Sequence, residues 1–116
     1  MSRGRSAAAA KVVEAAPVFA ALGDPTRLGL VARLCADGPL SIARLSEGAG
    51  VTRQAVTKHL HTLADAGLVR NIARGRERIW ELEARRLEKA RASLDQISLQ
   101  WDAVINRLKS FVEDEP

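Results

Sequence analysis

Apolar residues recur at helical spacing between positions 17 and 66 of this 116-residue chain. The segment PVFAAL, residues 17–22, predicts a short helix that ends at Gly23. Asp24 and Pro25 then form a helix start, with a carboxylate at the N-cap and proline at the first helical position. We expect the helix that follows to present one apolar face, made of Leu28, Val31, Ala32, Leu34 and Cys35.

Two further helices are predicted before Gly67. Ser41 is placed to cap the first, IARLSEGAG, which should bury Ile42 and Leu45. Thr52 is placed to cap the second. The apolar positions of this second helix are spaced to lie on one face, and they are Val56, Leu60, Leu63 and Ala64.

The pattern changes in the stretch LVRNIARGRERIWEL. Its apolar residues alternate loosely with polar ones on both sides of Arg74-Gly75-Arg76, which predicts a two-stranded hairpin with glycine at the turn. From Ala84 onward the helical pattern returns for about 30 residues. The predicted order is therefore four helices, two strands and a long helix.

Charge is concentrated in the middle of the chain. Residues 53–78 hold six Lys/Arg and two Asp/Glu, an excess equal to the net charge of +4 of the whole chain. Such a basic stripe is typical of a protein that binds a polyanion, although a solvated surface without a partner has the same composition. Hydrophobic residues make up 47% of the chain, which fits a folded domain, and no apolar run is long enough to span a bilayer.

The third and fourth predicted helices are joined by the short, glycine-bearing link EGAGVT, which is typical of a helix-turn-helix. The second helix of such a pair reads the DNA major groove with its N-terminal residues. Arg53 can bind guanine and Gln54 can pair with adenine. The side chains of Thr52, Thr57 and Lys58 suit phosphate, and His61 suits a phosphate or a base edge.

The hairpin carries arginines at its tip, namely Arg74, Arg76 and Arg78, with Arg70 at its base. A basic wing after a recognition helix is expected to lie along the DNA backbone or to enter the minor groove. The alternative is a solvated hairpin whose charges prevent edge-to-edge aggregation.

The sequence does not favour a metal site or an enzyme. His59 and His61 are two positions apart, so a helix points them in different directions and they cannot chelate one ion together. His59 is expected to pack at the edge of the core, and Cys35 inside it. No nucleophile–base pair, carboxylate cluster or phosphate-cradling loop indicates an enzyme, and no cofactor is expected. A single cysteine fits a reducing, cytoplasmic location.

The last helix carries an apolar seam at alternating steps of three and four residues. Its large members are Leu87, Leu94, Ile97, Trp101, Val104, Leu108 and Phe111. Such a seam predicts pairing with a second copy of the chain. The alternative is that the helix folds back along its own domain.

Three segments together resemble the ArsR family of winged helix-turn-helix repressors: ALGDPTRLGLVARL, LSIARLSEGAGVTRQAVTKHLHTLADAGLV and ARGRERIWEL. The resemblance spans residues 17–83 and implies a homodimer that binds double-stranded operator DNA. It implies DNA contacts by the recognition-helix and wing residues named above. The paired cysteines of metal-sensing members are absent from SIARLSEGA, and the last helix has Asp95 and Asp102 but no histidine. The seam ending WDAVINRLKSFVE resembles the metal-free, autorepressor branch, so no metal site is expected.

The sequence thus predicts a mainly α protein with a winged helix-turn-helix fold. We expect a flexible tail over 1–14, a DNA-binding domain over 15–83 and a dimerisation helix over 84–116. The predicted function is that of a dimeric repressor that binds a palindromic operator through residues 52–66 and the wing at 70–78. The alternative is a winged-helix module that binds DNA without sequence preference, or that binds a protein.

Overall fold

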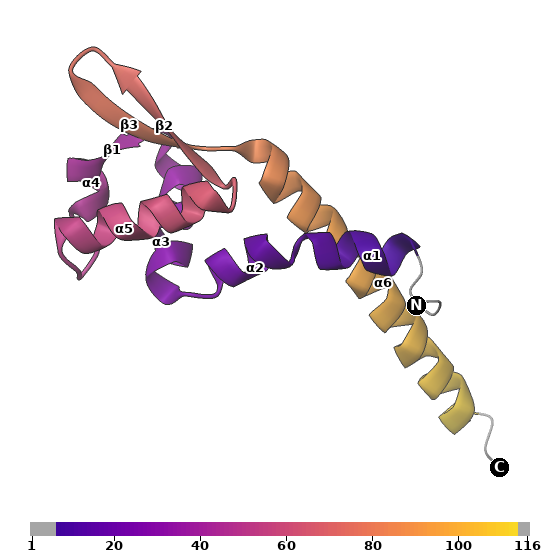
Figure 1. Cartoon of the computed structure of the whole chain (residues 1–116). Helices are drawn as coiled ribbons and strands as arrows, with labels where there is room; N and C mark the ends of the chain where they lie inside the picture. Colours follow the sequence, from indigo (N-terminus) through magenta and orange to yellow (C-terminus); the bar gives the residue numbers. More distant parts are fainter. Residues whose placement is uncertain (1–6, 114–116) are drawn as a thin grey trace.

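The computed structural model describes residues 7–113 and shows a small helical domain from which one long helix projects (Figure 1). The elements in chain order are α1 (Ala7–Glu14), α2 (Ala16–Leu22), α3 (Pro25–Asp37), β1 (Leu40–Ser41), α4 (Ile42–Ser46), α5 (Arg53–Asp65), β2 (Val69–Arg74), β3 (Glu77–Leu82) and α6 (Ala84–Glu113). The predicted winged helix-turn-helix fold is confirmed, including the 30-residue length of α6.

Two elements are additional to those predicted. The helix α1 lies within the segment expected to form a tail, and residues 1–6 of that segment lie outside the described residues. Its sequence, AAAAKVVE, is rich in the strongest helix former, and α1 contacts α6. The strand β1 has only two residues, too few to show an alternating pattern. It pairs with β3 in the register Leu40↔Trp80, which gives a three-stranded antiparallel sheet of order β1-β3-β2.

The three predicted helix caps are confirmed. Asp24 Oδ2 accepts a hydrogen bond from the backbone N–H of Arg27 at 3.0 Å at the start of α3. Ser41 Oγ and Thr52 Oγ1 accept equivalent bonds at the starts of α4 and α5, at 3.3 and 3.1 Å. These bonds satisfy backbone donors that a helix leaves unpaired, so each helix begins at a defined residue.

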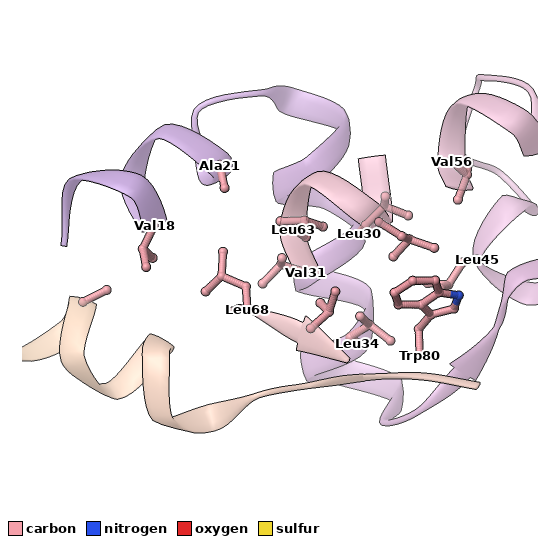
Figure 2. Packing of buried hydrophobic residues seen from close by; sticks show 13 residues of the cluster. Val18, Ala21, Leu30, Val31, Leu34, Leu45, Val56, Leu63, Leu68 and Trp80 are labelled. Carbon is pink, nitrogen blue, oxygen red and sulfur yellow. The ribbon is translucent and has the colours of Figure 1, made fainter. Parts of the chain in front are cut away.

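The core is centred on the apolar face of α5 (Figure 2). Val56, Leu60 and Leu63 of this helix have no exposed surface. They belong to a cluster that also contains Leu30, Val31, Leu34, Leu45, Leu68 and Trp80. Burial of a large apolar side chain stabilises a fold by roughly 1.5–3 kcal/mol, so this cluster fixes the rotation of α5 within the domain.

The apolar face predicted for α3 was partly wrong. Leu30, Val31 and Leu34 are buried, whereas Leu28 is 52% exposed. Ala32, which we expected on the same face, and Cys35, which we expected in the core, are also exposed. Positions 30, 31 and 34 have the i, i+1, i+4 spacing of a helix face that the α5 cluster covers, and this face is rotated away from Leu28 and Cys35.

The hairpin turn is as short as a hairpin allows. Arg74 pairs with Glu77 at the ends of β2 and β3, which leaves Gly75 and Arg76 as the two turn residues. Gly75 has φ +64°, whereas Arg76 has a negative φ. Positive φ at the first turn residue alone is the pattern of a type II′ turn, which matches the twist of the two strands. The predicted hairpin and its tip are confirmed.

Gly67 follows the C-terminus of α5 and has φ +79°. The side chain of Arg86, from the first turns of α6, lies across this glycine. A Cβ added at Gly67 would stand 2.9 Å from Arg86 Cγ and 3.1 Å from Arg86 Nε. The end of α5 and the start of α6 are therefore in direct contact, and only glycine suits the position.

We predict that Gly67→Ala lowers the free energy of unfolding by about 1–2 kcal/mol, because alanine is strained at positive φ even if Arg86 moves aside. Gly29→Ala is the matched control, since Gly29 lies inside α3 with no atom within 4 Å of an added Cβ. We expect this control to raise the stability by up to about 1 kcal/mol. Urea unfolding of both variants measures the difference, and equal effects would contradict the assignment.

Candidate nucleic-acid interface

The helices α4 and α5 form the helix-turn-helix, and the core determines which face of α5 is free. Because Val56, Leu60 and Leu63 point inward, the opposite face of α5 is solvated. That face contains Arg53, Gln54, Lys58 and His61, all of which are exposed. The first turn of α5 holds no acidic residue, so the positive end of the helix dipole is not neutralised there.

The two threonines of this helix make local hydrogen bonds as well. Thr52 caps the helix, and the Thr57 hydroxyl, which is half-buried, donates to the carbonyl oxygen of Arg53 at 3.0 Å. Each hydroxyl keeps some capacity for a further hydrogen bond, since oxygen has two lone pairs and one proton. Among the described residues, the side chains of Arg53, Gln54, Lys58 and His61 on this face make no such local hydrogen bond.

The two histidines face different elements, as the helical geometry predicted. His59 is half-buried, and its Nδ1 lies 3.5 Å from Arg27 Nη1 and 4.0 Å from Asp24 Oδ2. His61 is exposed, and its ring stands edge-on to the ring of Trp80, with 5.7 Å between centroids and an interplanar angle of 87°. This contact of α5 with β3 joins the recognition helix to the wing.

The strand register divides the wing arginines between two faces. Arg78 pairs with Ala73 and shares the face of the sheet that carries Trp80. Arg74 pairs with Glu77 and lies on the opposite face, and Arg76 is a turn residue. Arg78 therefore lies on the side of the hairpin that meets α5, a distinction that the amino-acid sequence did not reveal.

Arg70 differs from the arginines at the tip. Its Nε donates to Glu81 Oε1, and its Nη1 lies 3.5 Å from Glu83 Oε2. The hydrogen bond to Glu81 and the two nearby carboxylates raise the pKa of the Arg70 guanidinium. Arg74, Arg76 and Arg78 have no ion pair within residues 7–113, so their charges are available to a partner.

Two arginines of α3 hold the site together, and sequence reasoning missed this role. Arg33 Nη1 donates to the carbonyl oxygens of Leu45 and Glu47, at 3.2 and 2.9 Å, where α4 ends. Arg27 Nε donates to the carbonyl oxygen of Ala21 at 2.7 Å, where α2 ends. Both arginines satisfy carbonyls that lack helical partners. No signal in the amino-acid sequence pointed to these contacts, because their acceptors are backbone carbonyls.

The long helix leaves most of its seam uncovered. Ala90 is buried and Leu87 is half-buried against the domain, because only the first turns of α6 contact it. Farther along, the exposed members of the seam are Leu94, Ile97, Trp101, Leu108 and Phe111, and Val104 is half-buried. The helix thus does not fold back along its own domain, and it extends away from it (Figure 1).

Two further properties concern residues 7–113. No group of three or more His, Cys, Asp and Glu side chains in this part of the chain is placed to hold a metal ion. None of its helices combines the length and the apolar character needed to cross a membrane.

A helix-turn-helix with a basic, exposed second helix and a two-stranded wing defines the winged helix-turn-helix class of DNA-binding proteins. A family model described as a helix-turn-helix domain matches residues 22–72. The HTH-type transcriptional regulator Rv2034 of Mycobacterium tuberculosis is 34% identical over 95 residues, which cover 82% of this chain and 85% of that protein.

Solved structures agree with this class. An ArsR-like transcriptional regulator from Rhodococcus sp. RHA1 superposes with a TM-score of 0.72 at 34% identity, covering 89% of this chain and 96% of the other. The ArsR family transcriptional regulator RHA00566 gives a TM-score of 0.65 at 30% identity, covering 74% and 88%. The chain belongs to the ArsR-like winged helix-turn-helix transcriptional regulators. It is a DNA-binding regulator and not an enzyme.

We predict a pH-dependent contribution from Asp24, which caps α3 beside the recognition helix. The hydrogen bond from the Arg27 backbone lowers the pKa of this carboxyl below its ordinary value of 3.8. Its stabilising effect is therefore complete above that value and is lost as the pH falls through the lowered pKa of the folded state. The stability gap between the wild type and Asp24→Asn should narrow between neutral pH and about pH 3 in urea unfolding. A gap independent of pH would contradict this.

Proposed function

We propose that the protein is a homodimeric repressor that recognises a palindromic operator by sequence. In this proposal Arg53 and Gln54 contact base edges in the major groove. Thr52, Thr57 and Lys58 bind phosphate, and His61 contacts a base edge or phosphate. Arg74, Arg76 and Arg78 follow the backbone or the minor groove beside it. A protein that binds operator DNA in this way is expected in the cytoplasm, where chromosomal DNA lies.

The observation that carries the proposal is the placement of Arg53 and Gln54. They are the first two residues of α5, they are exposed, and no other described side chain holds them. The buried face of the same helix prevents α5 from rotating them away. A fork-shaped guanidinium and an amide at this position are groups that can discriminate bases by paired hydrogen bonds.

The wing supports a two-part contact. The edge-on contact of His61 with Trp80 keeps the hairpin beside α5, and Arg78 lies on the Trp80 face of the sheet. A duplex seated on the start of α5 would therefore meet Arg78 on the same side, with Arg76 at the tip. These cations would add a sequence-independent, salt-sensitive component to the affinity.

Dimerisation follows from the uncovered seam of α6. Trp101 is 64% exposed, and the seam residues Leu94, Leu108 and Phe111 are exposed to a similar degree. A second copy of the helix carries the same apolar stripe and could cover these side chains. A two-fold dimer places two recognition helices on one side of the duplex, so the operator would repeat the two-fold symmetry. A dimer seated on such a site excludes other proteins from that DNA, which is the physical basis of repression.

We predict that Gln54→Ala reduces the preference for operator over random DNA by about 1–3 kcal/mol, because one base-reading side chain is lost. Gel-shift titrations with the DNA upstream of the protein's own gene and with scrambled DNA measure this preference. Gln100→Ala is the matched control, since Gln100 is exposed on α6, outside the seam.

The control should leave both affinities unchanged. If Gln54→Ala weakens binding to both DNAs equally, sequence reading by this residue is wrong. That result would favour a winged-helix module that binds DNA without preference. No shift with either DNA for the wild type would favour a protein partner.

We predict a wild-type mass of twice the 12.6 kDa chain in light scattering at micromolar concentration. Trp101→Asp should raise the dimer dissociation constant by roughly a hundredfold or more, because each copy loses the burial of one large side chain. Leu99→Asp is the control, because Leu99 is 70% exposed on the same helix but is not part of the seam.

The Leu99→Asp protein should remain a dimer. A wild-type monomer at micromolar concentration would contradict the seam argument. Equal dissociation by the two aspartate variants would show that the pairing does not depend on the predicted face of α6.

A further inference from the structure

A cleft lies between the N-terminal helices and α6. These helices stand away from the wing and from the start of α5 (Figure 1). The volume of the cleft is about 550 Å³, within the range of small-molecule sites in proteins. The helix α1 and the start of α2 form one wall, and residues 86–96 of α6 form the other. None of the residues proposed to read bases, to form the wing contact or to form the seam belongs to its lining.

The lining has a cationic part and an apolar part. Lys11, Arg86 and Lys89 bring three positive charges to the cleft, and Glu14 brings one negative charge. None of these three cations has an ion pair or a side-chain hydrogen bond within residues 7–113. The apolar wall is formed by Val12, Ala15, Val18 and Ala92.

We propose that this cleft binds a small amphipathic anion, of the class of aliphatic carboxylates, and that the bound ligand acts on the recognition helix through Arg86. The carboxylate would pair with the three cations, because unpaired lysine and arginine side chains gathered at one site attract an anion. The aliphatic part would lie against the valine and alanine wall, because burial removes its apolar surface from water.

Arg86 provides the link to the DNA-binding face. Arg86 lines the cleft, and its side chain at the same time lies across Gly67, the glycine that follows α5. An anion that draws the guanidinium into the cleft changes the packing at the end of the recognition helix. By linkage, a ligand that changes DNA affinity must have its own affinity changed by DNA to the same degree. This second step rests on the proposed function, whereas the binding site does not.

The site is tested first without DNA, by calorimetric titration of the full chain with octanoate, octanol and acetate. We expect saturable binding of octanoate, and affinities about tenfold or more weaker for octanol and acetate, each of which lacks one half of the ligand. The double variant Lys11→Gln/Lys89→Gln should bind octanoate about tenfold or more weakly. Arg107→Gln/Lys109→Gln removes the same charge from α6 outside the cleft and should bind like the wild type.

Absence of octanoate binding would overturn the proposal, as would equal binding of octanol or equal losses in the two double variants. If a segment of a second copy fills the cleft, octanoate will not bind.

The link is tested by gel shift with saturating octanoate. We expect a change in DNA affinity of about fivefold or more in the wild type and none in Arg86→Gln. If octanoate binds but the DNA affinity of the wild type does not change, the proposed effect through Arg86 is refuted, while the anion-binding site itself is supported. If the wild type binds no DNA at all, the proposed function fails and the calorimetric result still stands.

Discussion

The complete burial of one face of α5 is the constraint on which the rest of the structure depends. Val56, Leu60 and Leu63 are closed off from water by residues of α3, α4, β2 and β3. A helix buried this firmly on one side has no freedom to rotate, so its opposite side is determined too. The exposed positions of Arg53, Gln54 and Lys58 are thus a consequence of core packing, and the local sequence of the polar face has no part in it.

Hydrogen bonds at helix ends then determine how the surrounding elements sit on that core. Arg33 holds the last carbonyls of α4 and Arg27 holds those of α2. In addition, the rings of His61 in α5 and Trp80 in β3 pack nearly perpendicular to each other. Each of these contacts satisfies or orients a polar group at the border of the apolar cluster. Together they make the helix-turn-helix and the wing one continuous surface, with Arg86 extending the connection from the end of α5 into α6.

Local features were the most predictable from the amino-acid sequence. The caps at Asp24, Ser41 and Thr52, the turn at Gly75 and the start of α6 each depend on a few adjacent residues, and all were predicted. Features that depend on distant partners were not. The inward face of α3 was misplaced because the packing of α5 decides it, and β1 exists only because β3 pairs with it.

The candidate site shows the same division. The exposed residues of α5 could be predicted from helical spacing alone. Arg70 is paired with glutamates, whereas the arginines at the tip have no ion pair among the described residues. This difference could be found only from the register of the hairpin, which places Arg70 opposite Glu81. The contact of Arg33 with α4 is invisible in the sequence, because its acceptors are backbone carbonyls, which every residue has.

The central claim is that two copies of α5, joined through α6, read one symmetric site. Hydroxyl-radical footprinting on the DNA upstream of the protein's own gene tests it most directly. The account predicts two protected segments of related sequence, inverted about a centre, whose midpoints are about one helical turn or a whole multiple of it apart on one side of the duplex. A single protected segment without inverted symmetry, or uniform protection along the fragment, would contradict it.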